Sequence, residues 1–200
     1  MPNWCNNTLT IKSKNQQFLE EVQKAVQDEK LLTYMVPPPD TDDYNAQGWY
    51  NWNCANWGTK WDICDPQDGM VDGQYECNFN TAWAPPIEAI ENWFERAWQQ
   101  DLREEQIGHT IPDDCEVIIT YYEGGMCFCG VFAMKYNDLG DDKFHYCLQN
   151  DKFTIKNMEE TQNHANPYVN HHLYQHIEYE IEDLKELEED EQATEEEDDE

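Results

Sequence analysis

The chain has 200 residues, with 43 Asp and Glu against 12 Lys and Arg, which gives a formal net charge of −31. Such an acidic chain repels the phosphates of DNA, RNA and anionic lipids, which argues against direct nucleic-acid binding and against membrane adsorption. The length fits one domain with short extensions. The 8 Trp and 11 Tyr supply enough apolar surface for a core that needs no disulfide bonds.

The acidity belongs to the body of the chain as well as to its C-terminal end. Residues 178–200 hold 15 acidic residues and one lysine, whereas the other 177 residues hold 28 acidic and 11 basic ones. This charge favours a basic host protein as partner, one that binds nucleic acid or belongs to a defence system, because complementary charge steers association. The alternative interpretation is that the acidity only keeps the protein soluble.

The eight cysteines and the start of the chain predict a cytoplasmic protein with reduced thiols. The chain opens with Met1, Pro2, Asn3 and Trp4, without the basic and apolar regions of a signal peptide. No apolar run approaches the length of about 18 residues that a transmembrane helix needs. Cysteines stay reduced in the cytoplasm, and several are expected in the core as small apolar residues.

The N-terminal part alternates strand-type and helix-type patterns. Residues 4–12 predict a strand, residues 16–30 a helix with Phe18 and Val22 on its apolar stripe, and residues 31–36 a short β-type run stopped by three prolines. Residues 40–73 form an irregular, aromatic-rich insert that is expected to pack on the sheet. Residues 74–80 predict the next strand.

The following part repeats this alternation. Pro85 and Pro86 open a helix that is expected to run to residue 102. Residues 115–122 and 126–134 predict two strands, joined by a turn in which Gly124 and Gly125 supply positive φ angles. The second of these strands is apolar on both faces and is therefore expected to be central. Residues 144–148 and 152–158 predict a further hairpin.

The order of strand, helix, strand, strand, helix and strand predicts an α+β, ferredoxin-like fold, in which an antiparallel sheet carries two helices on one face. The aromatic insert, the extra C-terminal hairpin and an acidic helical tail are additions to it. The predicted domain spans residues 1–160, an amphipathic helical extension spans 161–187, and a disordered acidic tail spans 188–200.

Four short motifs occur in an order that is similar to a known family. They are MPNWCNN at residues 1–7, NWGTKWD at 56–62, TAWAPP at 81–86 and YEGGMCFCG at 122–130. Together they resemble the YubB-like ferredoxin-like domain family of phages and conjugative plasmids, over about residues 1–135. The resemblance implies a ferredoxin-like fold and a mobile-element origin, with the host cytoplasm as the location. It implies no reaction, cofactor or catalytic residue.

The second motif contains a candidate ligand slot. Trp57 and Trp61 could wall a slot for a flat or phosphorylated group, with Thr59 beside them, Lys60 as a cation and Asp62 as an acceptor. The alternative is that both tryptophans belong to the core and that the lysine pairs with a neighbouring acid.

Two clusters have the residue types of metal sites but not the spacing. The acidic run from Asp62 to Glu76 fails the register of an EF-hand loop, which leaves only an irregular cation site as an alternative. His172 and His176 are four residues apart on one helix face, which suits zinc, but no CxxC accompanies them. Solvent-exposed histidines at a helix start are therefore expected, with no metal and no cofactor.

A C-terminal amphipathic helix is the second candidate site. Its apolar stripe consists of Leu173, Ile177, Ile181 and Leu184, and the candidate partner-binding surface adds Glu178, Glu182 and Asp183. Such a stripe can dock in a partner's groove. The alternative is that it packs on its own domain or forms a homodimer.

No sequence signature of catalysis surrounds any cysteine, histidine or glycine-rich segment, so a non-enzymatic protein is expected. The favoured function is a phage or plasmid accessory protein that binds and inhibits a host or defence protein through an acidic, DNA-mimicking surface. A small-molecule or nucleotide-binding module that uses the aromatic insert is the first alternative. An enzyme of unrecognised type is the second.

Overall fold

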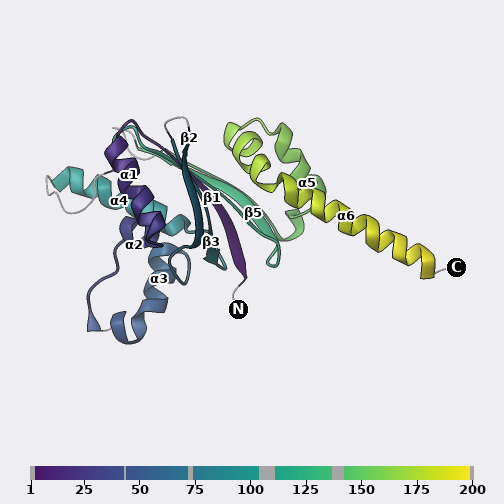
Figure 1. The fold of residues 1–200 in the computed structure, drawn as a ribbon, viewed down its shortest axis with the longest axis horizontal. Helices are drawn as coiled ribbons and strands as arrows, with labels where there is room; N and C mark the ends of the chain where they lie inside the picture. Colours follow the sequence, from purple (N-terminus) through teal and green to yellow (C-terminus); the bar gives the residue numbers. More distant parts are fainter. Residues whose placement is uncertain (1–2, 43, 72–73, 104–110, 137–141, 199–200) are drawn as a thin grey trace.

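A computed structural model of the protein describes residues 3–42, 44–71, 74–103, 111–136 and 142–198 (Figure 1). Its centre is an antiparallel sheet of six strands in the order β2-β3-β1-β4-β5-β6. The α+β class and the antiparallel sheet are thus confirmed, and the sheet is larger than predicted. The strands are β1 (Trp4–Lys12), β2 (Cys64–Val71), β3 (Gln74–Ala82), β4 (Glu116–Glu123), β5 (Phe128–Lys135) and β6 (Asp142–Gln149).

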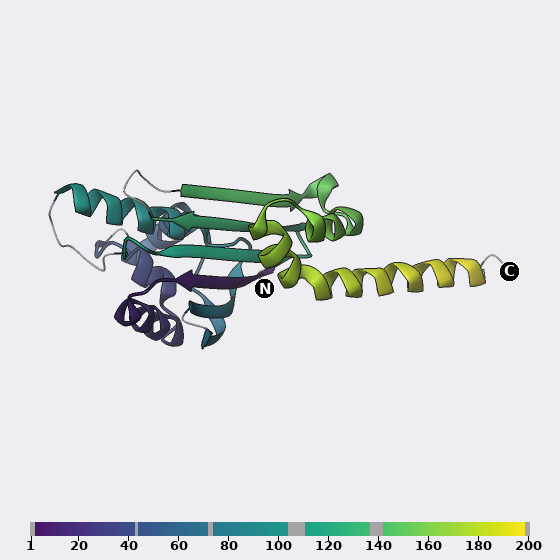
Figure 2. The same ribbon diagram turned by 90° about the horizontal axis from the view of Figure 1, so that it is seen from above.

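Helices cover both faces of the sheet, as Figures 1 and 2 show. One face packs against α1 (Gln16–Gln27), α2 (Leu31–Met35), α3 (Trp49–Trp57) and α4 (Ile87–Arg103). The other face carries the C-terminal segment. This segment consists of η2 (Asn150–Lys152), α5 (Ile155–Glu160), η3 (Thr161–Asn163), the π-helix η4 (Tyr168–Leu173) and α6 (Tyr174–Asp198), and another π-helix, η1 (Tyr44–Gly48), precedes α3.

Two hydrophobic cores result from this arrangement. The strand alternation places Leu9 and Ile11 of β1 in the larger core under α1–α4. The smaller core lies between β4–β6 and the C-terminal helices and includes Ile118 and Leu148. Strand β5 supplies Phe132 to the larger core and neighbouring residues to the smaller one, so its predicted central position is confirmed.

The predicted β-type run at residues 31–36 is wrong, because this segment forms α2. Asp62 lies 30 residues further along the chain and caps the helix. One carboxylate oxygen accepts a hydrogen bond from the backbone N–H of Leu32 at 2.8 Å, and the other accepts one from Thr33 at 2.9 Å. These two N–H groups have no partner within the helix, so the distant carboxylate stabilises its first turn.

The second strand instead lies inside the predicted irregular insert. Strand β2 contains Asp65, Pro66 and Gly69, which are uncommon in strands, and a register shift separates Cys64 from Gln67. It pairs with β3 and lies at the edge of the sheet, where a missing N–H and a bulge are tolerated. The remainder of the insert is largely helical, in η1 and α3.

The predicted hairpin at residues 144–158 is also wrong in its second half. Strand β6 pairs with β5, but α5 follows it, with the Thr154 hydroxyl capping the N–H of Asn157 at 3.2 Å. The turn between β4 and β5 is where it was predicted, but its left-handed residue is Cys127, with a φ of 56°, and not a glycine. The Glu123 carboxylate holds this turn by accepting the N–H of Gly125 at 3.1 Å.

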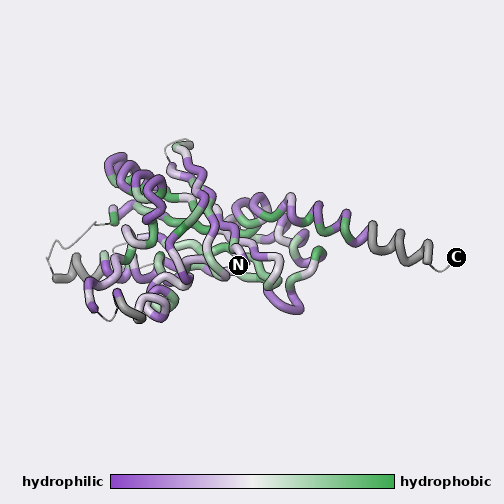
Figure 3. The backbone as a smooth tube through the Cα atoms, turned by 60° about the horizontal axis from the view of Figure 1, so that its bottom comes forward, coloured by the Kyte–Doolittle hydropathy of each residue, from purple (hydrophilic) through white to green (hydrophobic). Residues whose placement is uncertain are grey.

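Helix α6 begins against the sheet and then projects away from it (Figures 1 and 2). Hydrophobic residues recur along the part nearest the sheet, between hydrophilic ones (Figure 3). The helix extends to Asp198, whereas disorder was predicted from residue 188. Glutamate is a good helix former, and extending an existing helix costs less than nucleating one. Within the described ranges, no helix has the combined length and apolar character needed to cross a bilayer.

Candidate functional site

The sheet face beneath the C-terminal helices changes from apolar to polar at β1. On β1 from Asn6 to Lys12 and on β3 from Gln74 to Asn80 the residues on this face are polar, and the strand register aligns them in two rows. Thr8 lies between Asn78 of β3 and Thr120 of β4, and Thr10 lies between Glu76 of β3 and the apolar Ile118 of β4. The helices cover the apolar half, and the polar half borders them.

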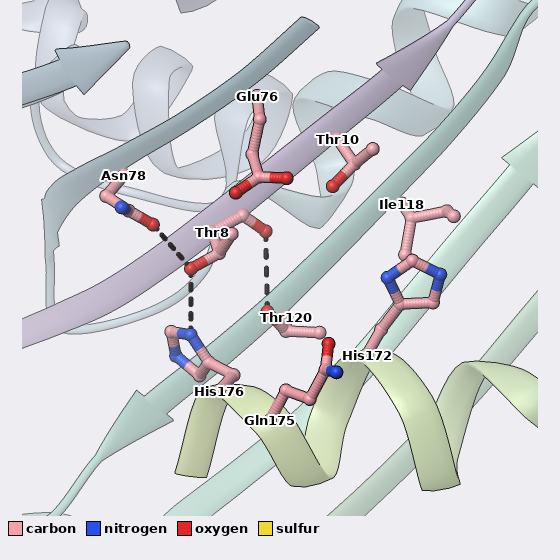
Figure 4. A pocket seen from close by; sticks show the side chains of 9 residues that line it. All are labelled: Thr8, Thr10, Glu76, Asn78, Ile118, Thr120, His172, Gln175 and His176. Atoms are coloured by element: carbon pink, nitrogen blue, oxygen red, sulfur yellow. Dashed lines mark hydrogen bonds between the residues drawn. The ribbon is translucent and has the colours of Figure 1, made fainter. Parts of the chain in front are cut away.

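A pocket of about 210 Å³ lies where these two halves meet (Figure 4). The two polar rows form its floor, and His172, Gln175 and His176 form the opposite wall, on η4 and the first turn of α6. Among the nine lining residues, which the structure describes in full, none is Lys or Arg. The pocket is therefore a polar site with one carboxylate and no permanent positive charge.

A hydrogen-bonded chain fixes one end of the pocket. The Thr8 hydroxyl donates to Oδ1 of Asn78 at 2.6 Å and also lies 2.8 Å from Nδ1 of His176. The Thr120 hydroxyl donates to the backbone carbonyl of Thr8 at 3.5 Å. Strands β3, β1 and β4 and helix α6 are thus joined by side chains at this end.

Both imidazoles are neutral at pH 7. Burial lowers the pKa of His176 to about 4. The pKa of His172 is also lowered to about 4, first by burial and then by the nearby charges of Lys12 and His171. The prediction of solvent-exposed histidines is therefore wrong for these two residues, because the helix that carries them docks on the sheet. A neutral imidazole offers one acceptor and one donor.

The Glu76 carboxylate is the charged group of the pocket. It forms no hydrogen bond or ion pair with any residue that the structure describes. Lys12, the closest cation along the same face of β1, is held by Glu116, with its Nζ 3.0 Å from Oε2. The pocket thus carries an unpaired negative charge beside several uncharged hydrogen-bonding groups.

The predicted ligand slot is only partly on the surface. Trp57 is buried, and its Nε1 donates to the carbonyl of Val36 at 2.9 Å. Thr59 is buried too, and its hydroxyl donates to the carbonyl of Ala82 at 2.9 Å. Since Asp62 caps α2, three of the five slot residues have internal structural roles.

Lys60 and Trp61, the other two slot residues, belong to an aromatic surface cluster. The Lys60 ammonium lies 4.2 Å from the ring centroid of Trp61, 5.2 Å from that of Trp83 and 5.9 Å from that of Tyr50. These distances are in the range of cation–π contacts. Trp61 is 40% exposed, so the cluster is open to solvent on one side. The ammonium of Lys60 thus lies within about 6 Å of three aromatic ring centroids.

The apolar stripe of the C-terminal helix packs on the protein's own sheet. Leu173 and Ile177 are fully buried and Ile181 is 4% exposed, all in the smaller core, and Leu184 is partly buried at its margin. In this structure the stripe is therefore covered in cis. The predicted acidic residues lie outside the core, and Glu178, Glu182 and Asp183 are exposed on α6.

Burial disfavours the reactive thiolate form of several cysteines. All eight cysteines are free. Burial raises the pKa of Cys77 and Cys129 to about 12 and raises the pKa of Cys147 above its usual range, so their thiolates are disfavoured at neutral pH. In the described part of the chain, no three His, Cys, Asp or Glu side chains are grouped so that they could hold a metal ion.

The pocket residues on the sheet were not identified from the sequence. Their only signal is the alternation of polar residues in β1 and β3, which by itself indicates no more than a strand with one hydrated face. No family model, curated protein or solved structure matches this chain. The site must therefore be interpreted from its own geometry.

Proposed function

We propose that the protein binds a basic protein surface through its acidic C-terminal helix, without catalysis. The observation that carries this proposal is the projection of α6 from the body. Its docked part ends near Leu184, and the helix continues for about 20 Å to Asp198, at about 1.5 Å per residue. Residues 178–200 hold 15 of the 43 acidic side chains. We call this projecting part of α6, beyond Leu184, the acidic rod. Such a rod can enter a basic groove that a flat surface cannot reach.

The carboxylates along the described part of α6 are available for a partner. Glu182, Asp183, Glu186, Glu188 and Glu189 are exposed. One ion pair within this region, between Lys185 and Glu159 of α5, ties the helix to the body. The density of negative charge on one rod supports a role in which carboxylates occupy positions where phosphates would bind. Association would then be fast and salt-sensitive.

The biological setting that we propose follows from the family resemblance and the charge together. The protein would be a phage or plasmid accessory protein that inhibits a host or defence protein with a nucleic-acid-binding groove. We further propose that β1, α1, β2, β3, α4 and β4 form a ferredoxin-like unit. The strand order β2-β3-β1-β4 and the placement of one helix after β1 and another after β3 support this assignment.

Charge-neutral variants of α6 test the proposed function. One variant replaces Glu182, Asp183, Glu186, Glu188 and Glu189 by Gln or Asn. The matched control neutralises five exposed acids outside α6, namely Glu20, Glu29, Asp40, Asp42 and Asp113. Binding to an oligolysine peptide and capture of a nucleic-acid-binding host protein are measured at 0.1 and 0.5 M salt.

We expect the α6 variant to lose most of the binding and the control to retain most of it, although both variants have the same net charge. Binding by the wild type should weaken steeply with salt. Equal losses in the two variants would show that only net charge matters. Tight binding that 0.5 M salt leaves unchanged would contradict the proposal.

The exposed aromatic cluster supports a second candidate function, binding of a flat small molecule such as a nucleotide. Trp61, Tyr50 and Trp83 offer ring faces, and Lys60 offers a positive charge. A nucleotide would stack on Trp61 and displace the lysine towards its phosphate. This candidate predicts that Trp61→Ala and Lys60→Ala each abolish nucleotide-induced shifts in melting temperature, and it fails if the wild type shows no such shift.

A further inference from the structure

The pocket between the polar half of the sheet and α6 has the composition of a cation site (Figure 4). Its charged group, Glu76, is unpaired among the described residues, and none of its lining residues is Lys or Arg. A carboxylate that faces a partly enclosed space without a cation has no positive charge nearby to balance its negative charge. Binding of a cation there is therefore favoured. An anion would meet Glu76 within a protein whose net charge is −31.

The size of the pocket and the spread of its polar groups select the kind of cation. A volume of about 210 Å³ exceeds the space of a single bare ion, since one water in the liquid occupies about 30 Å³. The acceptors are distributed over two strands and a helix and include the Glu76 carboxylate, the Thr10 hydroxyl and the Gln175 side-chain carbonyl. A ligand that uses them must present several donors in different directions.

A guanidinium group meets these requirements. It is planar, always charged, and carries five N–H donors in a fixed fork, whereas an ammonium is a compact and strongly hydrated point charge. Two of its N–H groups can donate to Glu76 in a bidentate pair, and the remaining donors can reach hydroxyl and amide oxygens on the floor and wall. The imidazoles of His172 and His176 are neutral, so they do not repel a bound guanidinium group.

We propose that this pocket binds the guanidinium group of an arginine side chain on the partner protein, with Glu76 as its counter-ion. The inference rests on the proposed function, because it takes the partner to be basic. It adds a second, structured contact at the base of α6, next to the acidic rod. The rod would supply long-range attraction, and the pocket would select arginine over lysine at one position of the partner.

The test uses small probes that carry a single functional group, so that binding in the pocket is measured separately from binding of a basic partner to α6. The full-length protein is titrated with n-butylguanidinium, with its neutral isostere n-butylurea, and with n-butylammonium, and amide NMR signals of residues 8–10 and 76–78 are followed. We expect n-butylguanidinium to shift these signals and to bind at least about tenfold more tightly than either other probe, because the charge-assisted bidentate pair is lost in both.

Variants locate the contact. Glu76→Gln keeps the shape of the side chain and removes its charge, and it should weaken n-butylguanidinium binding at least about tenfold. The matched control, Glu188→Gln, removes a charge from the exposed part of α6 and should leave this binding unchanged. If the melting curve of Glu76→Gln shows that this variant is unfolded, the comparison of the three probes on the wild-type protein still tests the proposal.

Several results would overturn the inference. These are equal affinity for n-butylurea or n-butylammonium, an unchanged affinity in Glu76→Gln, and shifts confined to other parts of the protein. A capped Gly-Arg-Gly peptide completes the test, and its failure to bind where n-butylguanidinium binds would exclude a protein side chain as the ligand. If these tests fail while oligolysine still binds α6, only the pocket assignment is lost.

Discussion

His176 makes the docking of α6 dependent on pH. Burial lowers the pKa of its imidazole from an ordinary value near 6.5 to about 4. The unfolded chain therefore binds a proton more readily than the folded chain between these two values. It follows that the contribution of this group to stability is present above pH 6.5, is lost as the pH falls through this window, and changes no further below about pH 4.

The magnitude follows from the two pKa values. Between pH 7 and pH 5 the difference in proton binding lowers the free energy of unfolding by about 2 kcal/mol for this one group. The perturbation is His176→Asn, in which the amide can replace Nδ1 in the contact with the Thr8 hydroxyl but cannot titrate. The assay is urea unfolding followed by tryptophan fluorescence at pH 7 and pH 5.

We expect the wild type to lose about 2 kcal/mol more between these two pH values than His176→Asn. The compared quantity is the change with pH, so a constant loss of packing in the variant cancels. His171→Asn, on an exposed side of the same segment, is the matched control. It removes only one of the charges that lower the pKa of His172, so it should change the pH dependence much less than His176→Asn does. An identical pH dependence in the wild type and His176→Asn would refute the reasoning.

Three further substitutions and one control test the packing and capping interactions, each by urea unfolding. Ile177→Ala removes a fully buried side chain from the smaller core and should cost about 2–5 kcal/mol, whereas Leu187→Ala, at a side chain that is 60% exposed, should cost less than about 0.5 kcal/mol. Asp62→Ala removes the cap of α2 and should cost about 1–2 kcal/mol, without loss of the β-sheet signal in circular dichroism. Trp57→Phe leaves the carbonyl of Val36 without its donor and should cost about 1–3 kcal/mol, and a smaller loss would show that water replaces the bond.

The sequence was sufficient where a segment's own pattern decides its structure. Strand β1 has the predicted bounds, because its apolar and polar residues alternate and its apolar face is buried. The central position of β5 followed from its two apolar faces. In both cases burial depends on the residue types of the segment itself.

Prediction failed where a distant residue decides the outcome. Helix α2 depends on a carboxylate 30 residues away, and no local pattern contains that information. Strand β2 is at an edge, where the usual composition of strands is not required. The pocket is formed by β1, β3, β4, η4 and α6, which are brought together only by the register of the sheet and the docking of the C-terminal helices.

The irregular edge formed by β2 limits how the protein can assemble. An exposed, regular edge strand is a template for pairing with the edge strand of another chain. In β2, Pro66 lacks an N–H, Asp65 has a positive φ of 52°, and the register shifts between Cys64 and Gln67. These features interrupt the row of backbone donors and acceptors. The sheet is thus protected on this side against growth into filaments.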